Sequence, residues 1–206
     1  MKIYETKVEA GTKQWLEIPV DEECSLKAAA FCGSRPGKRL IVTAGVHGCE
    51  YIGILAVSRL IQELDPRQMK GEVVFLPIAN EGGFYKEIKQ LVPEDGVNLN
   101  RAFPGTEMGS RSAKIAAAVE TYLYPGADFL VDLHSGDIHE MVVPFAFFPV
   151  AAGETVEKKA AAAAINGEKW SVQLGSAERN SGSSIRTGRT GTLDRKGGGC
   201  ISDKPV

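Results

Sequence analysis

The chain has 206 residues, of which 43% are hydrophobic, and a formal net charge of -2. This length and hydrophobic content suffice for one domain with its own core. There is no basic block typical of nucleic-acid binding, no apolar stretch of membrane-spanning length and no signal-peptide core at the N-terminus. The four cysteines form no Cys-x-x-Cys pair, so we expect reduced thiols and a cytoplasmic protein.

Apolar, β-branched runs alternate along the chain with stretches of helical spacing. The strands that we predict are Leu26–Cys32, Leu40–Ala44, Glu72–Pro77, Phe129–Leu133 and Met141–Phe148. The helices that we predict are Gly53–Leu64, Ser112–Tyr124 and Thr155–Ala164. This alternation predicts an α/β fold, a three-layer α/β/α sandwich around a mostly parallel or mixed sheet.

The segment Gly33–Lys38 joins the first two predicted strands and contains glycine and lysine, as phosphate-binding loops do. It lacks the spacing of such a loop and has no Ser or Thr after Lys38. We therefore predict a hairpin turn.

Two of the three histidines follow predicted strands. His47 and Glu50 come shortly after Ala44, and His134 comes directly after Phe129–Leu133. Three-residue spacing lets one turn bring His47 and Glu50 to the same side, and a third ligand from another strand closes the site. Two imidazoles and a carboxylate suit a catalytic zinc with its fourth position open to water. The alternative for His-x-x-Glu alone is a polar loop, but the strand context and the second histidine favour the metal site.

The neighbours of these residues allow further predictions. Gly45 and Gly48 flank His47, where they permit a sharp bend and leave room for a substrate. Cys49 is either a spare metal thiolate or a small apolar filler, and we favour the filler. Asp132 precedes His134 by two residues, so it either orients that ligand or lies solvated at the strand end.

Three segments together resemble a known family. Thr43–Tyr51, Asp95–Gly105 and Asp132–Gly136, with Pro144 and Phe145 downstream, are similar to motifs of the succinylglutamate desuccinylase/aspartoacylase branch of the zinc carboxypeptidase superfamily. The resemblance covers residues 25 to 150 and is most specific in the string Asn-Leu-Asn-Arg-Ala-Phe-Pro-Gly. It implies a carboxypeptidase-like fold and one zinc per chain on the His and Glu residues named above.

The resemblance also implies substrate-binding residues. Asn100 and Arg101 would grip a substrate carboxylate, whereas the alternative for Arg101 is a surface salt bridge of little energetic consequence. Lys89 stands where the family has an arginine that stabilises the oxyanion. Lysine keeps the positive charge but lacks the planar guanidinium that donates two parallel hydrogen bonds, which puts the role of Lys89 in doubt.

The tail departs from the family. After residue 180 the strand-helix pattern stops, where the resemblance implies a buried strand Gly-Val-Pro-Ala-Leu-Leu-Ile-Glu-Arg-Gly-Gly carrying the general-base Glu. If the reading frame over Gly188–Gly199 is moved forward by one nucleotide, the genetic code permits that strand. The codon of the general-base Glu then spans Arg195 and Lys196. We favour this frame shift over an ordinary disordered C-terminus. Residues 1–180 then form one incomplete catalytic domain, and residues 181–206 an irregular tail.

The sequence thus predicts a zinc-dependent hydrolase that deacylates a small acidic N-acyl amino acid, without nucleic-acid or membrane partners. The alternatives are a carboxypeptidase-type peptidase acting on a peptide, and a catalytically impaired metal-binding fragment that lacks the general base. A structural α/β domain without metal also stays open. The acyl group and the oligomeric state are not predicted.

Overall fold

The structure is a computed structural model that describes residues 1–142, 146–147, 172–175 and 200–201. Its strands are β1 (Lys2–Ile3), β2 (Thr6–Lys7), β3 (Thr12–Pro19), β4 (Ser25–Cys32), β5 (Arg35–Ala44), β6 (Lys70–Leu76), β7 (Leu91–Val92), β8 (Val97–Asn98), β9 (Phe129–Leu133), β10 (Ala146–Phe147), β11 (Val172–Gly175) and β12 (Cys200–Ile201). Its α-helices are α1 (Tyr51–Glu63), α2 (Glu81–Tyr85) and α3 (Arg111–Ala118). Short helical turns are η1 (Pro66–Gln68), η2 (Leu99–Arg101) and η3 (Val119–Leu123), of which η3 is a π-helix that continues α3.

A mixed sheet of eight strands forms the centre, in the order β12-β10-β11-β9-β5-β6-β4-β3. β5 runs parallel to both of its neighbours, β6 and β9, whereas β4 and β11 pair antiparallel to β6 and β9. Because β5 and β9 are adjacent and parallel, the segments that follow them meet at one edge of the sheet.

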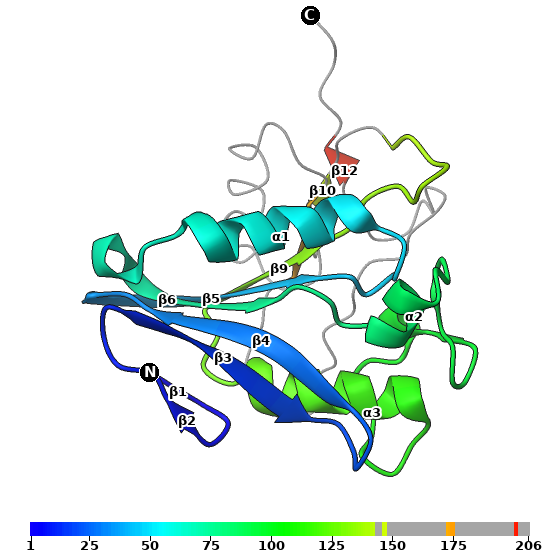
Figure 1. The fold of residues 1–206 in the computed structure, drawn as a ribbon, viewed down its shortest axis with the longest axis horizontal. Helices are drawn as coiled ribbons and strands as arrows, with labels where there is room; N and C mark the ends of the chain where they lie inside the picture. Colours follow the sequence, from blue (N-terminus) through cyan, green and yellow to red (C-terminus); the bar gives the residue numbers. More distant parts are fainter. Residues whose placement is uncertain (143–145, 148–171, 176–199, 202–206) are drawn as a thin grey trace, which may run out of the picture.

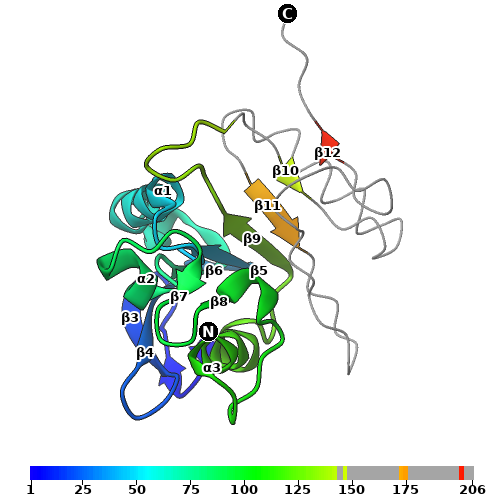
Figure 2. The ribbon, with the colours of Figure 1, turned by 90° about the vertical axis from the view of Figure 1, so that its right-hand side faces the viewer.

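Helices cover the sheet on both faces (Figure 1). α1 packs through Ile54, Val57 and Ile61 onto one face, in a cluster with Phe31 and Phe75. On the other face, α3 and η3 contribute to a second cluster, whose α3 and η3 members are Ile115, Ala116, Ala118, Val119 and Leu123. Figure 2 shows α1 and α3 on opposite sides of the sheet, with the β7–β8 hairpin at the end facing the viewer. The predicted three-layer α/β/α sandwich is confirmed.

The β4–β5 connection is not a hairpin, so that prediction was wrong. β4 and β5 do not pair with each other, because β6 lies between them. The Gly33 amide donates a hydrogen bond of 2.8 Å to the carbonyl of Gly71, next to the start of β6. Part of the expected turn belongs to β5, which begins at Arg35. Sequence could not reveal this, because strand order depends on contacts distant in the chain.

Other differences lie at the ends of the chain. β3 was missed because its residues from Thr12 to Trp15 are all exposed, on both faces of the strand, and only Leu16 and Ile18 are buried. In the predicted strand Met141–Phe148, Met141 and Val142 lie outside any strand and only β10 is observed. The predicted helix Thr155–Ala164 lies outside the described residues. Across the described segments, no helix has both the length and the apolar character needed to span a bilayer.

Candidate metal centre

His47 and Glu50 lie in the tight loop that joins β5 to α1. β5 ends at Ala44, and Gly45 turns the chain with a φ of +63°, a conformation that other residues rarely adopt. Glu50 is the N-cap residue of α1. The bend expected at Gly45 is therefore present, and it holds both side chains at the carboxyl edge of the sheet.

The space beside these glycines is filled by protein rather than left for a substrate. A Cβ at Gly45 would lie 2.9 Å from the Cα of Ile78, and a Cβ at Gly48 would collide with the backbone of Gly83 in α2. The prediction of substrate room at these positions was wrong. Glycine is needed because other backbone segments approach the loop closely.

His134 reaches the same place from β9. Thr43 of β5 is the register partner of Asp132 on β9. The Thr43 hydroxyl donates a hydrogen bond of 2.6 Å to Asp132 Oδ1, and Asp132 Oδ2 lies 2.9 Å from His134 Nε2. Asp132 is buried, with 4% of its surface exposed, so the solvated alternative was wrong. Asp132 instead links the strand to the imidazole.

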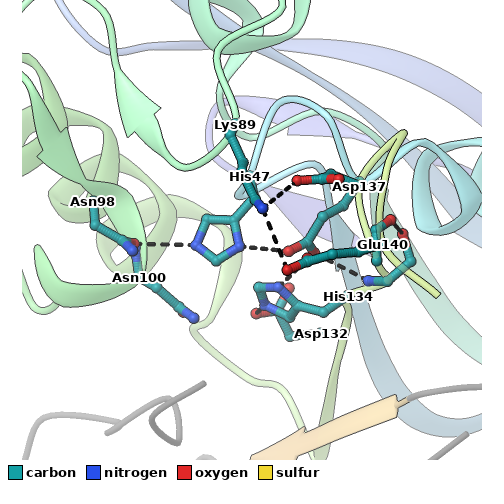
Figure 3. Close-up of polar contacts among 11 residues, drawn as sticks. His47, Lys89, Asn98, Asn100, Asp132, His134, Asp137 and Glu140 are labelled. Carbon is teal, nitrogen blue, oxygen red and sulfur yellow. Dashed lines mark hydrogen bonds and ion pairs between the residues drawn. The ribbon is translucent and has the colours of Figure 1, made fainter. Parts of the chain in front are cut away.

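The three predicted ligands converge on one point. Figure 3 shows the rings of His47 and His134 beside each other at this point. Glu50 lies between the imidazoles, with Oε1 2.7 Å from His47 Nδ1 and Oε2 2.8 Å from His134 Nδ1. One ligand atom from each residue lies within 4.8 Å of the others. His47, Glu50 and His134 are all buried.

Hydrogen bonds on the far side of each ring fix the tautomers. Asn98 Oδ1 accepts a bond of 3.0 Å from the Asn100 amide, and His47 Nε2 lies 3.1 Å from the same oxygen. Because that oxygen can only accept, His47 Nε2 carries the proton, and Asp132 requires the same of His134 Nε2. Both Nδ1 lone pairs of the neutral rings then face the Glu50 carboxylate. Only an added proton or a cation makes that arrangement favourable, so the donor set fits a metal ion.

Without an ion, the group behaves as a buried ion-pair network. Burial favours a higher pKa for Glu50, but hydrogen bonds from His134 and His47 outweigh it and lower the pKa to about 2. Burial also acts against a charged His134, yet the charges and hydrogen bonds of Asp132 and Glu50 raise the pKa of His134 to about 10. These shifts express the same attraction for positive charge that a bound cation would satisfy.

The turn η2 carries Asn100 and Arg101 beside this group. In Figure 3 the Asn100 side chain extends from η2 on the side of His47 and His134. Arg101 is exposed and forms no ion pair with any residue that the structure describes. The salt-bridge alternative for Arg101 therefore finds no partner within those residues.

Lys89 lies at the rim of the centre, across from the loop that follows β9 (Figure 3). Its Nζ is 2.5 Å from Asp137 Oδ2 and 3.3 Å from Glu140 Oε1. The hydrogen bond to Asp137 is the main cause of the raised pKa of Lys89. Lys89 is thus a cation held by two carboxylates at this rim.

Among the residues that the structure describes, no other candidate joins the converging group. Cys49 is buried and lies 4.0 Å from the Tyr51 hydroxyl, outside the converging group, which agrees with the filler interpretation. The expected general-base strand falls in a segment outside the described residues. Sequence reasoning missed Asn98, whose one available signal was its place at the start of the Asn-Leu-Asn-Arg string.

Several known proteins are similar to this chain. The N-alpha-acetyl-L-2,4-diaminobutyric acid deacetylase of Halomonas elongata is 35% identical over 137 residues, which is 64% of this chain and 40% of that protein. A succinylglutamate desuccinylase from a Silicibacter species superposes with a TM-score of 0.60 at 28% identity, covering 68% of this chain and 44% of that one. The product-bound ectoine utilization protein EutE of Ruegeria pomeroyi gives 0.61 at 27% identity, covering 73% and 48%.

The chain spans about half the length of these relatives or less. Residues 36–193 match the family model of the succinylglutamate desuccinylase/aspartoacylase catalytic domain. This match includes the whole β5–α1 loop, the turn η2 and the end of β9, from which the converging side chains come. The chain belongs to the succinylglutamate desuccinylase/aspartoacylase family.

Proposed function

We propose that this chain is the metal-binding catalytic part of a zinc-dependent amidohydrolase that removes an acyl group from an N-acyl amino acid. The observation that carries the proposal is the convergence of His47, Glu50 and His134, with both Nδ1 atoms directed at one carboxylate. Two histidines and a glutamate are a ligand set that catalytic zinc uses in hydrolases. Membership of a family named for two deacylases supports the choice of amide substrate.

The residues of the centre divide the chemical tasks. His47, Glu50 and His134 hold the zinc, which when bound lowers the pKa of a coordinated water and polarises the scissile carbonyl. Arg101 with Asn100 binds the carboxylate of the amino acid, because a guanidinium donates two parallel hydrogen bonds to a carboxylate. Lys89 supplies positive charge near the oxyanion that develops in the transition state, once its Nζ separates from Asp137 and Glu140.

The proposal also covers the organisation of the chain. Residues 1–180 form the catalytic domain, and the general base belongs to the strand that the shifted reading frame would restore. The Halomonas relative is named for an N-acetylated diamino acid. N-acetyl amino acids are therefore the first substrates to assay, and short peptides with a free C-terminus test the peptidase alternative.

Metal analysis tests the ligand assignment directly. We expect about one zinc per chain in the wild type. His47→Ala should lose most of it, since removing one of three protein ligands leaves an incomplete site. His139→Ala is the matched control, because the third histidine of the chain is exposed and lies outside the converging group. Equal zinc in all three proteins, or none in the wild type, would contradict the assignment.

A further inference from the structure

Asn98 contacts both halves of the proposed site through one atom. Its Oδ1 lies 3.1 Å from His47 Nε2 and accepts a hydrogen bond of 3.0 Å from the backbone amide of Asn100 (Figure 3). The first contact holds a proposed metal ligand. The second caps η2, the turn that carries Asn100 and Arg101.

The backbone donor determines which way the Asn98 amide faces. A peptide N–H can only donate, so the atom it meets must be the oxygen. The same oxygen then accepts from His47, which puts the proton on Nε2 and leaves the Nδ1 lone pair for the metal. The orientation of a ligand ring is thereby fixed by the cap of a neighbouring turn.

The location of Asn98 makes it a stable support. It ends β8, where it is the register partner of Leu91 in β7. The carbonyl of Leu91 in turn accepts a hydrogen bond of 3.0 Å from Asn80 Nδ2. The hairpin is thus tied to the N-cap of α2, and Asn98 cannot shift without disturbing that attachment.

We propose that Asn98 is a positioning residue that fixes the tautomer of His47 and the conformation of η2 together, so that the metal ligand and the substrate-carboxylate residues keep one relative placement. This inference rests on the proposed function for the identity of the metal and the substrate group. The two hydrogen bonds themselves exist in the chain independently of either.

Three variants of the full chain test the inference. Asn98→Ala removes both bonds, and Asn98→Asp keeps an oxygen that can accept both. Asp65→Ala is the matched control, because Asp65 is also the N-cap residue of a three-residue helical turn, η1, with Oδ1 3.0 Å from the Arg67 amide, but contacts neither histidine of the centre. Zinc affinity is measured by competition with a chromophoric chelator, and thermal unfolding of each metal-free protein shows whether it is folded.

We expect Asn98→Ala to weaken zinc binding by on the order of 10- to 100-fold, as loss of a partner behind a metal-bound histidine typically does. Asn98→Asp should restore affinity to within a few-fold of the wild type. Asp65→Ala should lower the unfolding temperature but leave zinc affinity unchanged, because η1 lies away from the centre. Wild-type affinity in Asn98→Ala, or an equal loss in Asp65→Ala, would overturn the inference.

Two spectroscopic readouts do not depend on metal. Imidazole nitrogen NMR should show a proton on Nε2 of His47 in the wild type and in Asn98→Asp, and mixed tautomers in Asn98→Ala. The Asn100 amide should exchange its hydrogen on the order of tenfold faster in Asn98→Ala, since it loses one hydrogen bond. If the wild type binds no zinc, the proposed function fails, and these two readouts alone decide for or against Asn98. If the His47 tautomer and the Asn100 amide exchange rate were both unchanged in Asn98→Ala, the positioning role of Asn98 would be refuted.

Discussion

At the scale of single residues, the site combines two kinds of electrostatic environment. Glu50 is surrounded by imidazole nitrogens, whereas Arg101 lies exposed with no ion-pair partner in the part of the chain that the structure describes. Arg101 belongs to η2, the turn whose N-cap residue Asn98 contacts His47. An exposed guanidinium on such a turn fits the proposed capture of a substrate carboxylate.

The role of Arg101 can be measured in a version of the chain with the corrected reading frame. Arg101→Ala should lower kcat/KM for an N-acetyl amino acid roughly 10- to 100-fold, because it removes hydrogen bonds between charged groups. Arg101→Lys should recover only part of that loss, since lysine lacks the bidentate fork. The readout is the ratio of kcat/KM for the free acid to that for its amide. Arg59→Ala, at an exposed arginine of α1 paired with Glu63, is the control. An unchanged ratio in Arg101→Ala would argue against carboxylate recognition.

At the scale of elements, the β5–α1 loop depends on the close approach of α2. Gly48 meets the backbone of Gly83, so the loop that carries the ligands and the short helix form one packed unit. This contact explains why a five-residue helix with two glycines forms at all. Its stability comes from packing and from the Asn80 cap, and not from intrinsic propensity.

This contact predicts the effect of adding a single methyl group. Gly48→Ala should destabilise the chain by roughly 1–3 kcal/mol, because a Cβ cannot be accommodated against fixed backbone. Gly82→Ala, at the neighbouring helix position, should be near neutral. Its Cβ would lie 3.0 Å from Glu94 Oε1, at the end of a flexible side chain, and 3.3 Å from Pro93 Cδ. Urea unfolding of both variants measures the difference. Equal stability of the two variants would show that the loop can move away from α2.

At the scale of the whole molecule, the chain contains a group of three residues that could hold a metal ion, but it covers only 40% of the Halomonas deacetylase. The three proposed ligands come from the β5–α1 loop and from the residue that follows β9, and β5 and β9 are neighbours in the sheet. On the proposed function, we expect metal binding and hydrolysis to be separable, with hydrolysis depending on the proposed general base.

The separation gives a test on two versions of the protein. On the frame-shift hypothesis, the 206-residue chain lacks a positioned general base. It should therefore hydrolyse N-acetyl amino acids on the order of 100- to 10,000-fold more slowly than a version with a one-base frame correction. Both versions should bind zinc. Sequencing the coding DNA past codon 180 checks the premise. The hypothesis fails if no Leu-Leu-Ile-Glu-Arg frame is open, or if the uncorrected chain already turns over at enzyme-like rates.

The sequence by itself determined the central elements and the types of ligand. Hydrophobic periodicity is a local property, so β4, β6, β9, α1, α3 and the end of β5 could be predicted to within a few residues, whereas the polar start of β5 at Arg35 could not. The short spacing of His47 and Glu50, and the position of His134 after a buried strand, likewise lie within local windows of the chain.

Only the tertiary structure decided how these pieces meet. Strand order places β6 between β4 and β5 and sets Thr43 opposite Asp132, and neither relation can be derived from local pattern. The same holds for Asn98, whose oxygen faces a histidine 51 residues away in the chain. Hydrogen bonds of this kind depend on angles and distances between separate elements. Sequence therefore indicates which residues can bind a metal, and packing determines which atoms face it.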